Sequence, residues 1–311
     1  MKAVRFHQYG DPSVLQYEDV DRPTPAAGQV LVQVAATSFN LVDDAIRAGY
    51  LQQAFPIRLP FTPGIDVAGT VAEIGSGVDG LAIGDAVFGS LPITEPGAAA
   101  ELVLAPAEVL AAAPTSIPLT EAAAVPIAAL TAWQALFEHA DLQSGQRILV
   151  NGAGGGVGGF VVQLAKQAGA FVIATASPRS TAAVRAQGAD QIIDYTTDRV
   201  TDAVTEPVDV VVNLVPTSEP ETTALIGLVT PGGIVVTTAS AAQDDPEGKV
   251  RALRMYVRSD AAQLAGIAAR IDAGELTVDV SRTYSLSDLT EVHEQGAAGT
   301  FRGRVVIVPN T

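Results

Sequence analysis

The chain has 311 residues, of which 48% are hydrophobic and 17% charged, and its 18 basic and 34 acidic side chains give a formal net charge of −16. This length exceeds one ordinary hydrophobic core and predicts two domains of roughly 100–200 residues each. The composition is that of a globular protein and excludes disorder as the main state. The acidic balance repels a phosphate backbone and argues against nucleic acid as a partner.

Cysteine is absent, and the three histidines, His7, His139 and His293, stand far apart in the sequence. Disulfides and thiolate zinc sites are therefore excluded, and a metal site is not expected. The first residues, MKAVRFHQYGDPS, lack the basic-then-apolar order of a signal peptide, so we expect a cytoplasmic protein. The most apolar stretch, residues 121–138, contains a proline and predicts a buried helix rather than a membrane span.

The first third of the chain alternates β-like runs with turn clusters. The runs are KAVRF, VLVQVAATSF from Val30, DVAGTVAEIG from Asp66 and DAVFGS from Asp85, and the clusters between them are rich in proline and glycine. Such alternation predicts a compact β domain with irregular connections. A helical pattern follows over about residues 120–139.

Strand-like and helix-like segments then alternate up to Val257. The expected strands are RILVNGA, AFVIATA, QIIDY, VDVVVNLV and GGIVVTTA, and the expected helices cover residues 157–168, 181–187 and 220–228. These strands are continuous apolar runs, as burial of both faces of a parallel sheet requires, so this part predicts a doubly wound α/β domain. After a helix over residues 261–273, the strand RVVIVP at residues 304–309 is expected to rejoin the first domain.

A glycine-rich turn lies between the strand ending near Asn151 and the following helix. Ala153, Gly155 and Gly158 occupy the three positions of the pattern G-x-G-x-x-G, with alanine in the first. In that pattern the second glycine lets the backbone approach a pyrophosphate, the third lets helix and strand pack closely, and the helix N-terminus faces the anion. We therefore predict a dinucleotide site, against the alternative of a purely structural turn, formed by Ala153, Gly154, Gly155, Gly156, Val157 and Gly158.

The end of the next strand indicates which dinucleotide binds. An Asp or Glu there would accept hydrogen bonds from the ribose 2′-hydroxyl of NAD and repel the 2′-phosphate of NADP. No acidic residue occurs from Phe171 through Ala189. The sequence therefore favours NADPH, with Arg179 facing solvent as the alternative to its ligand role. The expected phosphate ligands are Thr175, Ser177, Arg179 and Ser180.

Several motifs in a fixed order give the chain a family resemblance. They are SFNLVDDAIRAGY at residues 38–50, LPFTPGIDVAGTVAEIGSGV at 59–78, GDAVFG at 84–89, AAAVPIAALTAW at 122–133, NGAGGGVG at 151–158, GADQIIDY at 188–195 and the closing RGRVVIV. Together they resemble the medium-chain dehydrogenase/reductase superfamily, and within it the zinc-free quinone oxidoreductase-like branch. The resemblance implies an α/β protein in which residues 1–119 and 259–311 form a GroES-like β domain, and residues 120–258 a Rossmann doubly wound parallel-sheet domain that binds NADPH.

The zinc alcohol dehydrogenases of the same superfamily differ from this chain at the metal. Their catalytic ligands would fall at Asn40, Ile65 and about Ile127, and the hydroxyl of their proton relay near Val42. Alkyl side chains cannot bind zinc, so alcohol oxidation through a zinc alkoxide is not expected. The remaining chemistry is direct hydride transfer to a carbon or quinone that is already electrophilic.

The resemblance also implies a nicotinamide in the cleft between the domains, near Asn40, Asp43 and Thr131. Asn40 is either an amide donor to the substrate oxygen or a cap that holds its loop. Asp43, taken as exposed and ionised, is a loop anchor or ion-pair partner in preference to a general acid. Tyr50 lines the pocket or supplies a proton, or else it has only a structural role. Thr131 either lies beside the nicotinamide or bonds to its preceding turn.

Two further residues are candidate cofactor ligands. Tyr195 resembles the family's tyrosine near the adenosine phosphate, with packing as the alternative, and Asn213 ends a strand at the carboxyl edge of the sheet, where ligands bind. The chain departs from the family's pattern at residues 97–103, GAAAELV, where an aromatic residue is missing, and at Arg304, where lysine is usual.

The predicted function is NADPH-dependent reduction of small quinones or α,β-unsaturated carbonyls without zinc. An enoyl reductase of a biosynthetic pathway uses the same chemistry, and a non-enzymatic NADPH-binding sensor or structural protein is the alternative from another class. The segment KVRALRMYV, residues 249–257, is expected to be the last strand of the sheet. Its free edge predicts a homodimer.

Overall fold

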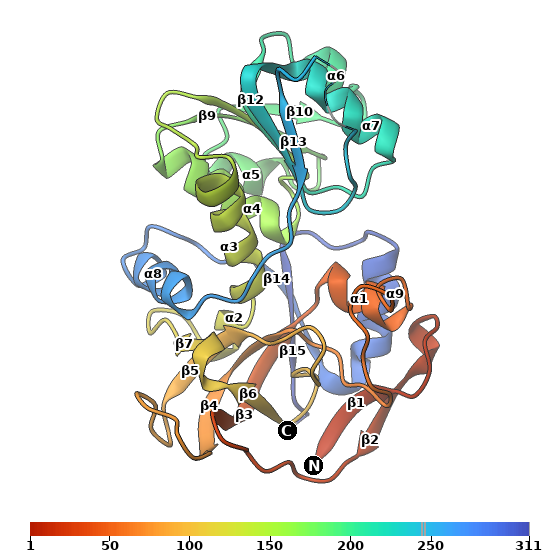
Figure 1. The fold of residues 1–311 in the computed structure, drawn as a ribbon, viewed down its shortest axis with the longest axis vertical. Coiled ribbons are helices and arrows are strands. Elements are labelled where there is room, and N and C mark those ends of the chain that lie inside the picture. Colours follow the sequence, from red (N-terminus) through yellow and green to blue (C-terminus); the bar gives the residue numbers. More distant parts are fainter. Residues whose placement is uncertain (244, 246, 311) are drawn as a thin grey trace. The chain divides into compact units, whose positions relative to one another are not determined.

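The computed structural model describes residues 1–243, 245 and 247–310 (Figure 1). The chain divides into two compact units, one comprising residues 1–127 and the chain from Ser259 onward, the other residues 128–258. The sequence predicts that the chain crosses between the domains after residues 119 and 258, and the two units divide after Ile127 and Arg258. The short helix α2 (Leu119–Ala122) contacts the β-sheet of the first unit, and so it belongs to that unit.

The first unit is built mainly on antiparallel strand pairs, although the last two strands of the chain pair in parallel. Among the described residues its main sheet has the order β14-β15-β3-β4-β5-β7, with β6 paired to β3, and β1 and β2 form a separate hairpin. Strand β15 pairs antiparallel with β3 through Val306 and Ser38, which confirms that the last strand rejoins the first domain. The strands are β1 (Lys2–Phe6), β2 (Leu15–Asp19), β3 (Gln29–Ser38), β4 (Asp66–Ile74), β5 (Ala86–Ser90), β6 (Leu102–Pro106), β7 (Leu110–Ala112), β14 (Val280–Ser285) and β15 (Arg304–Val308).

Helices α1 (Leu41–Arg47), α8 (Ala261–Asp272) and α9 (Leu289–Ala297) complete this unit, with 3-10 turns at Pro12–Val14, Ala107–Val109 and Leu286–Asp288. The sequence predicted α8 but only strands and turns where α1 lies. Helix α1 has two turns, and it buries the polar Asp43 and Arg47 together with Ile46. Because buried polar residues interrupt the apolar repeat, the pattern that identifies a helix is missing there.

The second unit is a parallel sheet. Among the described residues its strand order is β10-β9-β8-β11-β12-β13. All neighbours are parallel, and the central strands are buried, as Ile148, Leu149 and Val150 at 0% exposure illustrate. This confirms the predicted doubly wound domain. The strands are β8 (Arg147–Asn151), β9 (Phe171–Ala176), β10 (Gln191–Asp194), β11 (Val208–Asn213), β12 (Val229–Thr237) and β13 (Arg251–Arg254).

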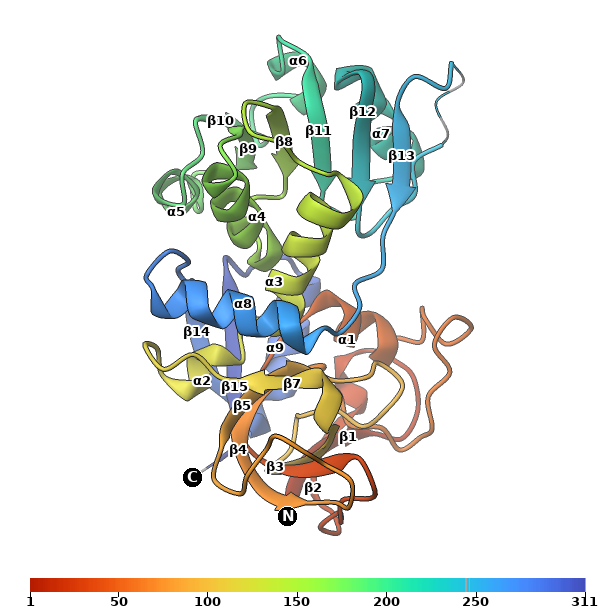
Figure 2. The same cartoon turned by 60° about the vertical axis from the view of Figure 1, so that its left-hand side comes forward.

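Helices cover both faces of this sheet (Figure 2). They are α3 (Pro126–Trp133), which begins just before the unit boundary, α4 (Gly156–Gln167), α5 (Thr181–Ala186), α6 (Val200–Ala203) and α7 (Glu219–Ala224), the last continued by a 3-10 turn at Leu225–Leu228. The prediction of a single helix over residues 120–139 is wrong, because this helical segment is divided. It is interrupted before Pro126, which has no amide hydrogen to continue α2 and is suited to begin α3, and it ends in a π-helix over Gln134–His139.

The two passages of the chain into and out of the second unit are tied together within that unit. The side-chain amide of Gln134 donates to the backbone oxygen of Arg258 at 3.0 Å and accepts from the backbone amide of Arg258 at 3.1 Å. The guanidinium of Arg258 also pairs with Glu138. In the described part of the chain, no helix is long and apolar enough to cross a membrane.

Candidate functional site

The glycine-rich turn joins β8 to α4 in the second unit. Gly152 has a φ of +96°, and its carbonyl oxygen accepts the amide hydrogen of Gly155 at 3.1 Å. A Cβ on Gly158 would lie 2.4 Å from that oxygen, whereas a Cβ on Gly155 would have no neighbour nearer than 3.4 Å. Gly158 is therefore needed for packing, and the open face of Gly155 at the start of α4 fits the approach of a dinucleotide pyrophosphate.

The turn after β9 lies against this glycine-rich turn. A Cβ on Gly154 would lie 2.4 Å from the hydroxyl of Ser180, and that hydroxyl accepts the amide hydrogen of Ser177 at 3.2 Å. Both serines are buried, at 7% and 5% exposure, and Arg179 between them is exposed. Of the four predicted phosphate ligands, Ser180 thus lies against the predicted pyrophosphate turn, and Ser177 and Arg179 belong to the same loop as Ser180.

The fourth ligand, Thr175, and the neighbouring candidate Asn213 lie inside the sheet. Their exposures are 1% and 0%, and their polar atoms bond to other protein groups. Tyr195 is half exposed at the end of β10, and Thr131 is buried on α3. The side chains of Thr175 and Asn213 are therefore buried and hydrogen-bonded within the protein.

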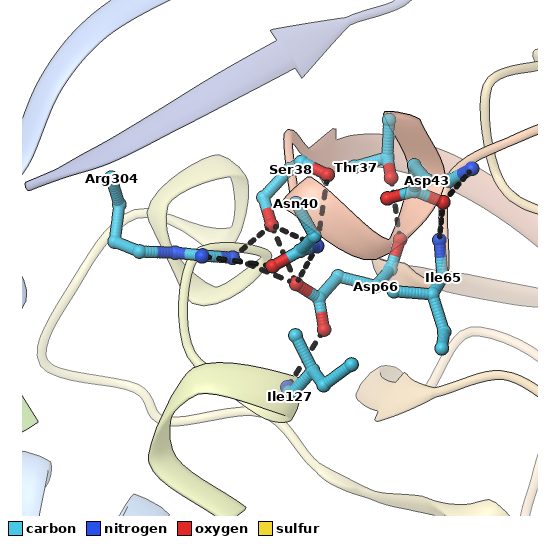
Figure 3. Close-up of polar contacts among 9 residues, drawn as sticks. Thr37, Ser38, Asn40, Asp43, Ile65, Asp66, Ile127 and Arg304 are labelled. Carbon is cyan, nitrogen blue, oxygen red and sulfur yellow. Dashed lines mark hydrogen bonds and ion pairs between the residues drawn. The ribbon is translucent and has the colours of Figure 1, made fainter. Parts of the chain in front are cut away.

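In the first unit, a buried ion pair joins four segments that are distant in sequence (Figure 3). The carboxylate of Asp66 accepts from Arg304 Nη2 at 2.8 Å, Asn40 Nδ2 at 2.9 Å and Ser38 Oγ at 2.5 Å. Its other oxygen accepts the backbone amide of Ile127 at 2.8 Å. Asp66 and Arg304 are 0% and 5% exposed, so the network ties together the ends of β3, β4, β15 and α3 away from water.

Charge and burial oppose each other in this pair. Desolvation raises the pKa of Asp66, and the guanidinium of Arg304 works against that rise. Desolvation also lowers the pKa of Arg304, but a guanidinium stays protonated in proteins. The pair is therefore ionic, and its charges are balanced by hydrogen bonds rather than by solvent.

The side-chain amide of Asn40 is engaged at both ends. Its nitrogen donates to Asp66 and, at 3.3 Å, to the carbonyl oxygen of Ser38, while its oxygen accepts from Arg304 Nη1 at 2.9 Å. Donation to a substrate oxygen would require one of these bonds to break. Of the two roles predicted for Asn40, the geometry agrees with the structural one, in which its side chain holds the loop.

Asp43 was expected to be exposed, and that expectation is wrong. Its side chain is 4% exposed, and Oδ1 accepts the backbone amides of Gly64 at 2.9 Å and Ile65 at 3.2 Å. Oδ2 has no hydrogen-bond partner among the described residues. Asp43 lines a cavity of about 10 Å³, which is at the lower limit of what can hold one water molecule. Desolvation raises the pKa of Asp43 to about 7, so this residue is a loop anchor that holds a proton below neutral pH.

Tyr50 does not join these residues. It follows α1 in the turn after Gly49 and is 82% exposed. Its hydroxyl is therefore in solvent, apart from the buried polar network.

The three positions that hold zinc in the related dehydrogenases meet around Asp66. Asn40 and the amide of Ile127 both bond to its carboxylate, and Ile65 directly precedes it. An amide and two alkyl groups do not fit a zinc ion. Within the described ranges, no group of three or more His, Cys, Asp or Glu side chains is placed to hold a metal. The ion pair itself was missed, although Arg304 had already marked a departure from the family's lysine.

Two family models match the chain. The model described as "Alcohol dehydrogenase GroES-like domain" matches residues 26–115, and the one described as "Zinc-binding dehydrogenase" matches residues 187–307. The first match lies within the antiparallel unit, and the second begins in the parallel-sheet unit.

Plant proteins are among the curated relatives. A chloroplast envelope quinone oxidoreductase homolog of Arabidopsis thaliana is 40% identical over 203 residues, and the match spans 63% of this chain and only 62% of the plant protein. Two others match over nearly the whole chain. A chloroplastic quinone-oxidoreductase of Triphysaria versicolor is 32% identical over 99% of this chain and 98% of its own length, and a 2-methylene-furan-3-one reductase of Solanum lycopersicum is 34% identical over 99% and 79%.

Solved structures share the whole fold. A quinone oxidoreductase from Coxiella burnetii has a TM-score of 0.92, 31% identity and 99% coverage of both chains. An NAD-dependent alcohol dehydrogenase and a mycobacterial protein complexed with NADPH each share 27% identity, with TM-scores of 0.89 and 0.87; both matches cover 99% of this chain, and 99% and 100% of the neighbours. The chain belongs to the medium-chain dehydrogenase/reductase superfamily and to its quinone oxidoreductase-like branch.

Proposed function

We propose that the protein is an NADPH-dependent reductase of quinones or α,β-unsaturated carbonyls that works without zinc. The observation that carries the cofactor is the open turn at Gly155, at the N-terminus of α4, which supplies backbone amides to a pyrophosphate. The named quinone oxidoreductases and the furanone reductase among the relatives support the substrate class. In both classes an electrophilic carbon or quinone accepts hydride directly.

The chemistry of the side chains around Asp66 excludes a zinc ion. Around Asp66, the place of a metal is taken by an amide, two alkyl side chains and the guanidinium of Arg304. A cation bound there would face an existing positive charge. The substrate must therefore be activated by its own conjugation rather than by a Lewis acid.

When bound, the reduced nicotinamide supplies the hydride, and a proton must complete the reduction. Asp43 is turned into the protein, and Tyr50 lies in solvent. We infer that the proton comes from water, because the carboxyl group of Asp43 is buried and the phenol of Tyr50 lies apart from the buried polar network. Substrate orientation then rests on the shape of the site more than on an acid.

Selectivity for NADPH over NADH is proposed from the turn after β9. The segment from Phe171 through Ala189 holds no carboxylate, and Arg179 is exposed between the buried Ser177 and Ser180, of which Ser180 lies against the glycine-rich turn at Gly154. Replacing Arg179 by Ala is expected to weaken NADPH binding about fivefold or more and to leave NADH binding unchanged, because only NADPH carries the 2′-phosphate. Isothermal titration with both dinucleotides measures this, and equal losses for the two would remove Arg179 from the phosphate site.

Turnover is tested by following NADPH absorbance with a panel of quinones, enones and simple aldehydes. We expect consumption with quinones or enones, unchanged by a chelator, and none with simple aldehydes. Tight NADPH binding without turnover on any member of the panel would instead favour a binding protein. Loss of activity with the chelator would contradict the zinc-free proposal.

A further inference from the structure

A line of buried side-chain hydrogen bonds runs across the carboxyl ends of β9, β8 and β11. The hydroxyl of Thr175 accepts the backbone amide hydrogen of Gly152 at 2.8 Å and donates to Asn151 Oδ1 at 3.0 Å. Asn151 Nδ2 donates to Asn213 Oδ1 at 2.8 Å. The three side chains are 1%, 7% and 0% exposed, so solvent does not compete for these bonds.

The donors and acceptors of this line leave the Thr175 hydroxyl a single arrangement. A hydroxyl has one hydrogen, and here it is given to Asn151, whose amide nitrogen is in turn directed at Asn213. The amide nitrogen of Asn213 continues the line to Thr217 Oγ1 at 3.2 Å and the backbone oxygen of Val215 at 3.3 Å. The hydroxyl of Thr175 is therefore held with its lone pair toward Gly152.

Gly152 is the residue at which β8 becomes the glycine-rich turn. Its φ of +96° suits glycine, and its carbonyl oxygen accepts the amide hydrogen of Gly155. That same oxygen would meet a Cβ on Gly158 at 2.4 Å. The two peptide groups flanking Gly152 thus set both the course of the turn and the packing of the first residues of α4.

We propose that Thr175 is a positioning residue for the dinucleotide, acting through the amide of Gly152, with Asn151 and Asn213 fixing the direction of its hydroxyl. The inference rests on the proposed binding of a dinucleotide by this turn. Thr175 and Asn213 then fix the backbone conformation of the pyrophosphate site. Recognition of the 2′-phosphate belongs to exposed groups such as Arg179. Thr175 should accordingly matter equally for NADPH and NADH.

The experiment compares Thr175→Val, which keeps the shape and removes the hydroxyl, with Thr175→Ser, which keeps the hydroxyl. Isothermal titration should show that Thr175→Val weakens NADPH and NADH binding by the same factor, about fivefold to tenfold, as expected for one lost buried hydrogen bond. Thr175→Ser should restore both affinities to within about twofold of the parent. If Thr175→Val does not fold, Thr175→Ala replaces it.

Thr237→Val is the matched control. Thr237 is also a fully buried threonine at the carboxyl end of a strand of the same sheet, but its hydroxyl donates to the backbone oxygen of Ser240 at 2.7 Å, away from Gly152. The melting temperature of the Thr237→Val variant is expected to fall, and its affinities for NADPH and NADH are expected to equal those of the parent. This separates a loss of stability from a loss of cofactor positioning.

Three results would overturn the inference. A loss confined to NADPH would make Thr175 a direct ligand of the 2′-phosphate. Unchanged affinities in Thr175→Val, with a lower melting temperature like that of Thr237→Val, would make its role purely structural. A parent protein that binds neither dinucleotide would refute the proposed function itself, and the inference with it.

Discussion

Asp43 shows how burial decides the state of a single residue. From the sequence it reads as an ionised surface carboxylate, but in the structure both its oxygens are out of solvent and one of them has no partner among the described residues. Desolvation raises its pKa to about 7, although the amide of Gly64 works against the rise, and the nearby charge of Asp66 adds to it. No pattern in the sequence encodes this, because it follows from how α1 meets the loop before β4.

The stability of the protein is expected to depend on pH through Asp43. Its pKa rises from an ordinary 3.8 to about 7 on folding, so the folded chain holds the proton more tightly, and this contribution to stability is lost as the pH rises toward 7. Asp43→Asn removes that dependence. As the pH rises toward about 7, the unfolding free energy of the variant should increase relative to that of the parent by about 1.4 kcal/mol per pH unit. Above about pH 7 the difference between the two proteins should stay constant.

Urea unfolding of both proteins between about pH 5 and 8 measures this difference. Asp11→Asn is the control, because a hydrogen bond from Ser13 lowers the pKa of Asp11, whose contribution is present above the ordinary value and lost only in more acidic solution. That variant should run parallel to the parent over the same range. A parallel curve for Asp43→Asn as well would show that Asp43 is ionised in the folded state.

Asn40 is expected to act on stability more than on turnover. Because its amide is bonded at both ends, Asn40→Ala should lower the unfolding free energy by about 1–3 kcal/mol. With saturating cofactor, kcat should fall less than tenfold, whereas loss of an oxyanion donor costs roughly 10²–10³. A drop of that larger size in the steady-state assay, with stability retained, would return Asn40 to the chemistry.

At the scale of elements, the sequence predicted the strands of the second unit and most strands of the first, but it did not predict α1 and β14. Buried parallel strands such as β8 and β11 are continuous apolar runs, and each is followed by a turn and a helix, so periodicity alone identifies them. In the first unit, α1 buries polar residues, and β14 has an exposed arginine at Arg282 and an exposed Thr283. Those segments are held by long-range pairing, which a local pattern does not contain.

Packing and binding depend on two different glycines of the glycine-rich turn, Gly158 and Gly155. Gly158→Ala would place a methyl group 2.4 Å from the carbonyl oxygen of Gly152, so it should lower the unfolding free energy by about 1–3 kcal/mol and impair NADPH binding as well. Gly155→Ala has room for the methyl group and an ordinary φ of −86°. It should leave stability within about 0.5 kcal/mol and weaken NADPH binding at least about tenfold.

Chemical denaturation together with titration of NADPH measures both variants. Gly227→Ala, with nothing near its would-be methyl group, is the control and should change neither quantity. If Gly155→Ala bound NADPH like the parent, the pyrophosphate would not approach this face of the turn.

The buried ion pair links β15 to β4 and α3. Arg304→Met would leave the carboxylate of Asp66 buried without its cation, at a cost of about 3–5 kcal/mol of unfolding free energy. Arg302→Met is the matched control, because the pair of Arg302 and Asp279 is partly exposed, at 32% and 29%, and should contribute about 0–1 kcal/mol. Equal losses in urea unfolding for the two variants would contradict the burial argument.

At the scale of the whole molecule, the parallel sheet ends at β13. That strand pairs with β12 on one side, and within the described residues no strand pairs with its other side. An unpaired edge of a sheet is a template for a second copy of the same chain, which supports the predicted homodimer. Sedimentation velocity at micromolar concentration should give the mass of two chains, and a monomer at that concentration would contradict the prediction.

Gln134 and Arg258 hold the entry and the exit of the second unit side by side through two backbone-to-side-chain bonds. The inserted domain thus starts and finishes at almost one point, so the surrounding domain is interrupted without being stretched. Such an insertion can be exchanged for another of the same ends without remaking either core. Recombination between relatives would therefore join the same first unit to a new parallel-sheet unit in a single step, with the pairing of these two residues as the joint.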